Sequence, residues 1–420
     1  MSWSIVLRAA LVAALLAAVL PSTHAAEDAS AITLPQAVAR ALRDSPQLAR
    51  FPFRLRAAEA LRDQAGRRPN PELALEVEHA AGTGAYGGLA SAELTLSLSQ
   101  MLELGGKRGL RRGLAEVEYA AVTQEQTIAE LDVAAETARR FIAVVEAQVQ
   151  RDLVRRRVGL ANRTAAQVET RVNAGRSSQA ERHKARVAML EAGLAAAAAE
   201  RELQIARRAL ATSWGAAAAD FGVAHADFFA LPDLGSLEAL EARVLDGPDL
   251  ARFVTERRRR ESELALARSA TTRNVTVGGG MRRYQATGDT AFRLGVSIPL
   301  GIADRNQGGI AAARERLGEL DTESRAALLE VRLVIAAAWT RLAQARDTVT
   351  ILHGEALLEA EQALSFTEQG YAAGRLSFLE LSDAQTLLLS VQADSLHAAA
   401  DYHRLLIELE RLTGRPVVAR

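Results

Sequence analysis

The sequence contains the same unit twice, and this repeat restricts the possible folds more than any other feature. The stretch DSPQLAR (44–50) recurs about 200 residues later as DGPDLAR (246–252), and NAGRSS (173–178) recurs as AAGRLS (372–377). Between these markers, NPELALEVEHA (70–80) corresponds to RNVTVGGGMRRY (273–284). Because the matching stretches keep the same order, we expect the chain to fold as two equivalent halves.

Each half contains a helical pattern that is too long for a compact domain. Over residues 107–175 and 305–374, apolar side chains recur at steps of three and four positions, which indicates coiled-coil seams. About 70 helical residues span roughly 100 Å at 1.5 Å per residue. In the first half the seam shifts phase after Val149 and resumes at Val154.

Both long patterns stop at the triplet Ala-Gly-Arg, so each half is expected to form a helical hairpin. The return helices are expected at 179–212 and 376–412. These cover only half the length of the long helices, and shorter helical patterns at 46–67 and 248–269 have the right length to stack end to end on them.

Each half is also expected to contain two strands, because apolar and polar residues alternate with a period of two. In one of them Leu94, Leu96 and Leu98 alternate with polar residues; similar alternation is found at 73–78 and 292–298. Ten-residue strands with one apolar face are typical of a membrane barrel with a wet lumen. A soluble sheet resting on a core shows the same alternation, so this pattern leaves both open.

Four strands per chain cannot close a barrel, and lipid does not tolerate open sheet edges because unpaired backbone groups find no water there. Closure therefore requires several copies, and three would supply twelve strands, which is within the range of known outer-membrane barrels. The expected fold class is mainly α, with a long α-barrel and a 12-stranded β-barrel formed by a homotrimer.

Composition excludes several classes of function. The 420 residues carry 51 basic and 51 acidic side chains, which argues against a nucleic-acid-binding protein. The one basic run, at 257–260, is expected to be a solvated helix face, with a phosphate or lipid contact as the alternative. The absence of cysteine excludes disulfides, thiolate metal sites and an acylated N-terminal cysteine.

The first 25 residues read as a secretory signal peptide, with Arg8 before an apolar run and PSTHA (21–25) as the cleavage region. The apolar run is too short for a membrane-spanning helix. The expected organisation is a signal peptide at 1–25, a first repeat at 26–213, a linking equatorial segment at 214–247 and a second repeat at 248–420.

Several motifs resemble those of the TolC-like outer membrane efflux proteins: ITLPQAVARAL, AGRRPNPEL, LSQMLELGGKRGLR and YAAGRLSFLELSDAQ. The forms RRPNPEL and LELGGKR are most similar to the heavy-metal, cobalt–zinc–cadmium branch. The resemblance implies a homotrimeric exit duct of a tripartite RND-type pump in the outer membrane of a Gram-negative bacterium, extending into the periplasm. It also implies partnership with a periplasmic adaptor and an inner-membrane transporter, and export of heavy-metal cations. Multidrug efflux and type I protein secretion remain alternatives, as does a periplasmic coiled-coil scaffold.

The two Ala-Gly-Arg breaks are the candidate functional sites. Gly175 and Gly374 permit the left-handed backbone that ends a helix, and Ser177 or Ser377 can cap the next helix. A simple turn does not explain the apolar Leu376, Phe378 and Leu379 at an exposed tip. The resemblance implies adaptor docking at this tip, at the following residues: Gly175, Arg176, Gly374, Arg375, Ser377 and Leu379.

The resemblance further implies that Glu380 and Asp383 line the periplasmic entrance, where three copies would form an acidic ring that favours cations. The ordinary alternative is that both carboxylates are simply solvated. The first half has Glu181 and Lys184 at the equivalent positions, so only one of its two positions is acidic.

No set of residues indicates an enzyme, a cofactor site or a resident metal. GTGAYG (82–87) matches a nucleotide-binding pattern in spacing, but it joins two strands and is expected to be a loop. His397 and Asp401 share a helix face, from which His403 is turned away, so no metal site is expected there.

Overall fold

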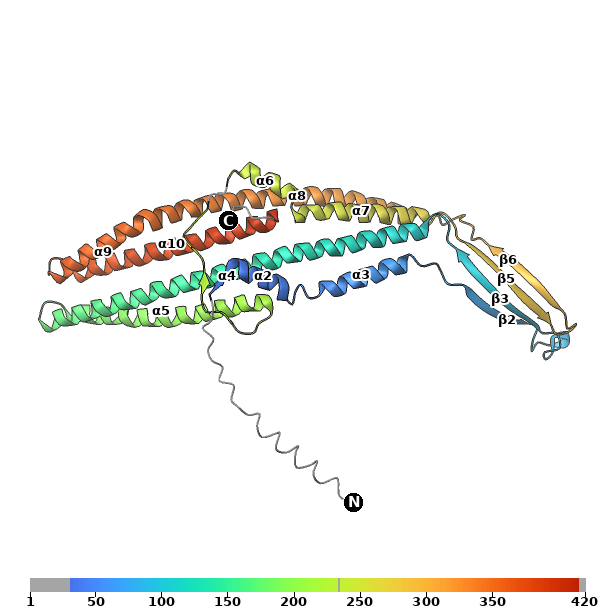
Figure 1. The fold of residues 1–420 in the computed structure, drawn as a ribbon, viewed down its shortest axis with the longest axis horizontal. Helices are drawn as coiled ribbons and strands as arrows, with labels where there is room; N and C mark the ends of the chain where they lie inside the picture. Colours follow the sequence, from blue (N-terminus) through green and yellow to red (C-terminus); the bar gives the residue numbers. More distant parts are fainter. Residues whose placement is uncertain (1–30, 233–234, 415–420) are drawn as a thin grey trace, which may run out of the picture.

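The computed structural model describes residues 31–232 and 235–414, so the signal peptide expected at 1–25 lies outside the described residues. The molecule is elongated, with a sheet at one end and two helical hairpin tips at the other (Figure 1). The two halves of the chain lie side by side along its length.

The long helices and the shorter helices stacked on them lie side by side as columns along the body (Figure 1). The first half supplies α4 (Lys107–Asn173), which is flanked by α5 (Gln179–Ala211) and α3 (Phe51–Ala65) stacked end to end. The second half repeats this with α8 (Gln307–Val349) and α9 (Leu357–Ala372) in one column, and α10 (Phe378–Thr413) and α7 (Pro248–Ser269) in the other. Hairpins, stacked short helices and their approximate bounds are as the sequence predicts.

One short helix begins later than predicted. The helical pattern at 46–67 contains α3 only from Phe51, because α2 (Leu34–Asp44) ends at Ser45 and residues 46–50 form turns. Pro46 ends α2, since the helical region is disfavoured for the residue before a proline, and Ser45 has an extended backbone at φ −63° and ψ 126°. Pro52 has no N–H to donate to the carbonyl four residues earlier, so the α-helix begins only at Phe51, with this proline in its first turn.

The two long columns differ in their regularity. The helix α4 runs for 67 residues without interruption, whereas between α8 and α9 the backbone forms a π-helical segment, η3 (Thr350–Ala356). This segment is aligned by the repeat with the place in α4 where the hydrophobic seam shifts phase. Both long helices therefore change the face they bury at the same level of the body.

The strands form one antiparallel sheet in the order β2 (Glu72–Glu78), β3 (Glu93–Leu102), β5 (Val275–Tyr284) and β6 (Thr290–Ser297). The register puts Leu75, Leu96, Met281 and Phe292 in one row across the sheet. The neighbouring row, on the opposite face, contains Glu76, Thr95, Arg282 and Ala291. The alternation predicted from the sequence is thus realised, and β3 pairs with β5 to join the halves.

The middle segment packs against both halves. Its strand β4 (Ala224–His225) pairs in parallel with β1 (Ile32–Thr33). Gln148 of α4 donates from Nε2 to the Ala224 carbonyl at 2.8 Å and accepts at Oε1 from the Ala224 N–H at 2.9 Å. Further on, the Phe229 ring stacks on His353 in the π-helical segment, with 3.9 Å between ring centroids. The helix α6 (Leu237–Leu245) packs on α8 and α10 through Leu240 and other apolar residues.

The basic run at 257–260 lies on α7 and is largely ion-paired. Arg257 pairs with Asp321 of α8, and the Arg259 and Arg260 guanidiniums pair with Glu256 and Glu263 of their own helix. These contacts support the prediction of a solvated helix face.

Across residues 31–232 and 235–414, no helix combines the length and the apolar character needed to cross a bilayer.

Candidate functional site: the two hairpin tips

Both hairpins turn with the same backbone chemistry. The residue after each helix C-cap is a glycine in the left-handed region, Gly175 at φ 69° and Gly374 at φ 75°. The next N–H reaches back across the helix end: Arg176 donates to the Arg171 carbonyl at 2.8 Å, and Arg375 donates to the Gly370 carbonyl at 2.9 Å. This is the Schellman arrangement that satisfies the last carbonyls of a helix, and the glycine prediction is confirmed at both tips.

The capping serine of the first hairpin was misassigned. The structure places Ser178, not Ser177, at the N-cap of α5, where its hydroxyl accepts from the Glu181 N–H at 3.2 Å. Ser377 caps α10 as predicted. Ser178 and Ser377 are equivalent in the repeat, whereas Ser177 corresponds to Leu376. The prediction was wrong because the first tip has two adjacent serines and the second of them is the cap.

The second tip has a full capping box, in which cap and N3 residue exchange hydrogen bonds. The Glu380 N–H donates to Ser377 Oγ at 3.3 Å, while the Ser377 N–H and hydroxyl donate to Glu380 Oε2 at 2.7 and 2.8 Å. The Ser377 backbone and side-chain hydrogen bonds lower the pKa of the Glu380 carboxyl. One predicted entrance carboxylate therefore also stabilises the start of α10.

Only one of the three apolar tip residues remains without a neighbour to cover it. Leu376 folds over Gly370, where a Cβ would lie 2.5 Å from Leu376 Cδ1. Phe378 packs edge-on against Tyr371 with 6.4 Å between ring centroids. Leu379 is 67% exposed. The local fold thus accounts for Leu376 and Phe378, and Leu379 is the apolar residue of the tip that is available to a partner.

The two tips are joined to each other, a feature that the sequence did not reveal. The Arg171 guanidinium of α4 donates to the Tyr371 carbonyl of α9 and to Ser177 Oγ, the latter at 3.2 Å, and lies 4.5 Å from the centroid of the Tyr371 ring. Further along, Gln385 Nε2 donates to Thr164 Oγ1 at 2.8 Å. No sequence motif marks Arg171, because the repeat places Gly370 at its equivalent position.

A small core lies beneath these bonds and contains side chains from both hairpins. Its buried members are Leu160, Val168, Val172, Ala185, Leu364, Tyr371 and Leu381. Tyr371 is 1% exposed, and its hydroxyl is without a hydrogen-bond partner in the described part of the chain. The tips therefore form one packed unit and not two independent turns.

The predicted site residues all lie on the surface of this unit. Arg176, Arg375 and Asp383 are exposed, as is the capping Glu380. Among the residues described, no cluster of three or more histidine, aspartate or glutamate side chains is arranged to hold a metal ion. His397 Nδ1 lies 3.6 Å from Glu146 Oε1, and His403 Nε2 is 2.9 Å from the Phe228 carbonyl, so the two histidines have separate partners.

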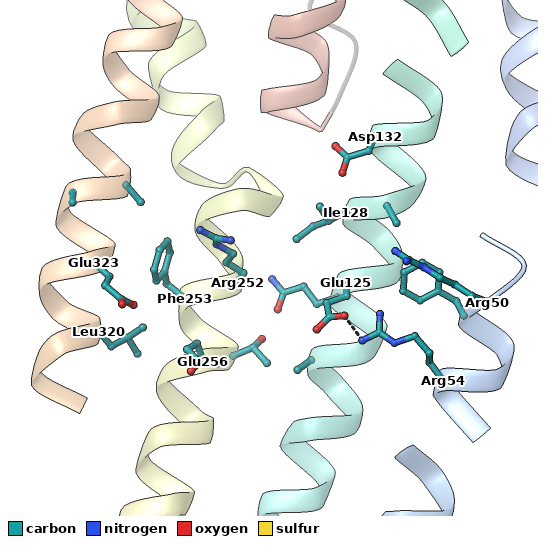
Figure 2. A pocket seen from close by; sticks show the side chains of 17 residues that line it. Arg50, Arg54, Glu125, Ile128, Asp132, Arg252, Phe253, Glu256, Leu320 and Glu323 are labelled. Atoms are coloured by element: carbon teal, nitrogen blue, oxygen red, sulfur yellow. Dashed lines mark hydrogen bonds and ion pairs between the residues drawn. The ribbon is translucent and has the colours of Figure 1, made fainter. Parts of the chain in front are cut away.

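A cavity lies far from the tips, between helices of the two halves. This cavity of about 850 Å³ contains the repeat-equivalent pairs Arg50–Phe51 and Arg252–Phe253. Figure 2 shows Arg50 on one side of α4 and Arg252 and Phe253 of α7 on the other, with Arg54 of α3 and Glu125 of α4 joined by an ion pair. The cavity lies beside the beginnings of α3 and α7, at the joints between the stacked helices.

Comparisons with a protein family, with individual sequences and with solved structures agree with one another. The outer membrane efflux protein family matches residues 37–216 and 242–415, one segment for each repeat. The cobalt-zinc-cadmium resistance protein CzcC of Cupriavidus metallidurans is 29% identical over 93% of this chain and 91% of its own length. The nickel and cobalt resistance protein CnrC of the same species is 26% identical over 77% of this chain and 76% of its own.

Solved structures show the same fold at lower identity. The channel CusC has a TM-score of 0.76 at 18% identity, over 92% of this chain and 93% of that one. The outer membrane protein VceC of Vibrio cholerae has a TM-score of 0.72 at 18% identity, over 92% and 97%. With both repeats matched and the fold shared along the body, the chain belongs to the outer membrane efflux protein family and has its TolC-like fold.

Proposed function

We propose that three copies of this chain form an outer-membrane exit duct that exports heavy-metal cations as part of a tripartite efflux system. A periplasmic adaptor and an inner-membrane RND transporter would complete the system. The observation that carries the proposal is the four-stranded sheet with two unpaired edges, β2 and β6, on a family-matched helical body.

The sheet favours assembly in a membrane. One of its faces exposes large apolar side chains, with Phe292 and Leu294 of the edge strand 87% and 90% exposed. Such a face belongs in lipid, where the backbone of β2 and β6 must also be paired. Pairing β6 of one copy with β2 of the next satisfies both requirements when the ring closes.

The helical body supports the same head-to-tail arrangement. One outer column exposes apolar side chains on α5, Val187, Leu190 and Leu194, and the opposite outer column exposes Leu358 and Phe366 on α9. Unlike surfaces on opposite edges make heterologous contacts, which form a ring when the rotation closes. Each chain would then contribute four helical columns to the wall of a tube.

The choice of substrate rests on the relatives. CzcC and CnrC are named for resistance to cobalt, zinc, cadmium and nickel. We therefore expect a strain lacking this chain to become sensitive to these cations, with little change towards drugs. Growth inhibition measured for each metal and for a drug panel tests this. Sensitivity to drugs with normal metal resistance would assign the duct to multidrug efflux, and loss of a secreted protein alone would assign it to type I secretion.

A further inference from the structure

Positive charge is concentrated where the helical body meets the sheet. The connecting segments 66–71, 103–112, 268–274 and 303–306 contain nine lysine and arginine side chains and two carboxylates, in a chain whose net charge is zero. All four segments lie at the same end of the helices, beside the strands (Figure 1). The charge is therefore gathered into one narrow zone of the long axis.

Part of this charge holds the joint together. Lys107 Nζ donates to Asn274 Oδ1 at 2.6 Å and to the Thr272 carbonyl at 2.5 Å. The Arg111 guanidinium forms two hydrogen bonds with the Glu103 carboxylate, at 2.5 and 2.8 Å. Arg273 donates to the Asp304 carbonyl. These contacts link the starts of α4 and α8 to the strands and explain why these basic residues are needed.

A fourth basic side chain, Arg305, donates to the Gly301 carbonyl at 3.3 Å, and the remaining five have no such partner. Five exposed arginines make no ion pair and no side-chain hydrogen bond within residues 31–232 and 235–414; they are Arg67, Arg68, Arg108, Arg112 and Arg268. We call these five the basic collar. They come from the ends of α3 and α7 and the start of α4, and are spread along the joint. Exposed arginines without an ion pair occur elsewhere on the described helices, such as Arg156 and Arg186, so what sets the collar apart is its position beside the strands.

The basic collar directly adjoins the end of the apolar sheet face. Leu104 is 43% exposed, and Leu300 and Ile302 continue the apolar alternation of β6 beyond its end, at 78% and 77% exposed. At the end of the sheet farther from the helices, Arg282 is bonded to Glu78, Glu93 and Thr95, while its neighbour Arg283 is exposed and makes no ion pair among the described residues. The five collar arginines form the larger unpaired group, and they lie on the helical side of the sheet, next to the residues that would enter lipid.

We propose that the basic collar binds the phosphate groups of anionic phospholipids in the membrane leaflet next to the helical body. This rests on the membrane placement of the sheet in the proposed function. Guanidinium groups form paired hydrogen bonds with phosphate oxygens, and an apolar band beside them receives the acyl chains. The five groups are distributed along a rim and do not converge on one point, which suits a row of lipid headgroups better than a single free phosphate ion.

The test compares the wild type with a variant in which all five collar arginines are changed to glutamine. Both are reconstituted in nanodiscs containing phosphatidylglycerol and phosphatidylcholine, and the lipids that remain bound are identified by native mass spectrometry. We expect the wild type to retain phosphatidylglycerol at about fivefold over the bulk ratio, and the glutamine variant to lose this enrichment. An Arg→Lys variant at the same five positions preserves the charge and should preserve most of the phosphatidylglycerol enrichment.

Equal enrichment in the wild type and the glutamine variant would overturn the proposal. So would saturable binding of inorganic phosphate at the collar without lipid enrichment, or a change in ion selectivity at unchanged lipid binding, which would place the arginines in the lumen. If the glutamine variant does not assemble, raising salt from about 0.1 to about 1 M on the wild type must abolish the enrichment. Trimer content and single-channel conductance, recorded on the same samples, show separately whether the duct itself has failed.

Discussion

The two hairpins use the same turn, yet they differ in the long helix that leads to it and in the cap that follows it. The first has an uninterrupted 67-residue helix, whereas the second has a π-helical segment at 350–356. The first cap is a single hydrogen bond to Ser178, and the second is a reciprocal box between Ser377 and Glu380. Duplicated sequence thus preserved the backbone of the turn, while the side chains around it diverged.

The two tips differ in the kinds of side chain that they contain. The second tip contains the large buried Tyr371 where the repeat places Val172 in the first, and the apolar Leu379 beside the acidic Glu380 and Asp383. The first tip supplies Arg171, which bonds to the backbone of the second. We infer that the first hairpin acts as the support and that the second presents the groups that meet a partner or the permeating ions.

Adding bulk to the second tip gives the largest expected effect. Gly374→Trp should abolish efflux while trimers persist in the outer membrane, because the ring obstructs the adaptor surface. Gly374→Ala is the matched control, since it carries the same strain at φ 75° without the bulk. Metal resistance and trimer content are measured together, and Gly175→Trp should have a weaker effect. Normal resistance with Gly374→Trp would contradict docking at this tip.

Removing the buried ring from the second hairpin should destabilise the tips by about 3–5 kcal/mol, as for other large aromatic residues replaced by alanine. Tyr371→Ala is compared with Val172→Ala, which removes a smaller side chain and should cost about 1–2 kcal/mol. Opening free energies are measured by hydrogen exchange of the tip amides. Tyr371→Phe should be neutral, because the hydroxyl has no partner among the described residues. A large loss with Tyr371→Phe would mean that assembly supplies a partner for it.

Breaking the bond between the hairpins should cost about 1–2 kcal/mol, because Arg171 donates two hydrogen bonds from a half-buried guanidinium. Arg171→Met keeps the aliphatic stem and removes the donors. Since the chain has no cysteine, paired spin labels introduced at residues 173 and 373 can report the distance between the tips. The distance distribution should broaden with Arg171→Met and stay unchanged with Arg176→Met. Equal distributions for all three proteins would show that the apolar core alone holds the tips together.

Charge at the second tip should affect ion selectivity. Glu380→Gln with Asp383→Asn is expected to lower the cation preference in single-channel recordings by about threefold, because two carboxylates per chain are lost from the entrance. Glutamine at 380 preserves the capping box, so the helix start is not disturbed. The first-hairpin variant Glu181→Gln should change selectivity less. If the double variant has the same selectivity as the wild type, the prediction of an acidic ring is wrong.

The smallest expected effect is acid loosening of the second cap. Hydrogen bonds from Ser377 lower the pKa of Glu380 in the folded state, so their contribution is present above the ordinary glutamate pKa of 4.5. It is lost as the pH falls through the lowered folded value. A spin label at residue 379 should therefore gain mobility below that pH, and Glu380→Gln should remove the pH dependence. Unchanged mobility in the wild type would show that the box does not order the tip.

The repeat and the helix bounds were predictable because periodic patterns act locally. The left-handed positions at Gly175 and Gly374 followed from helix-ending chemistry, and α7 has the bounds that its pattern predicted. The wrong cap at Ser177 and the late start of α3 arose where one residue more or less changes the turn. Such boundaries depend on which of several neighbouring hydrogen bonds forms, and a pattern of residue types does not decide this.

The long seams, the alternating strands and the two glycine breaks determined the architecture by themselves, since each is a short-range pattern that only one kind of element satisfies. Tertiary structure decided what the side chains at those breaks do. It placed Arg171 against Tyr371, some 200 positions away in the sequence, covered Leu376 and Phe378 and left Leu379 exposed. It also made Glu380 a cap as well as a candidate gate charge. These outcomes depend on how two hairpins pack together, and contacts between distant segments leave no periodicity in the sequence.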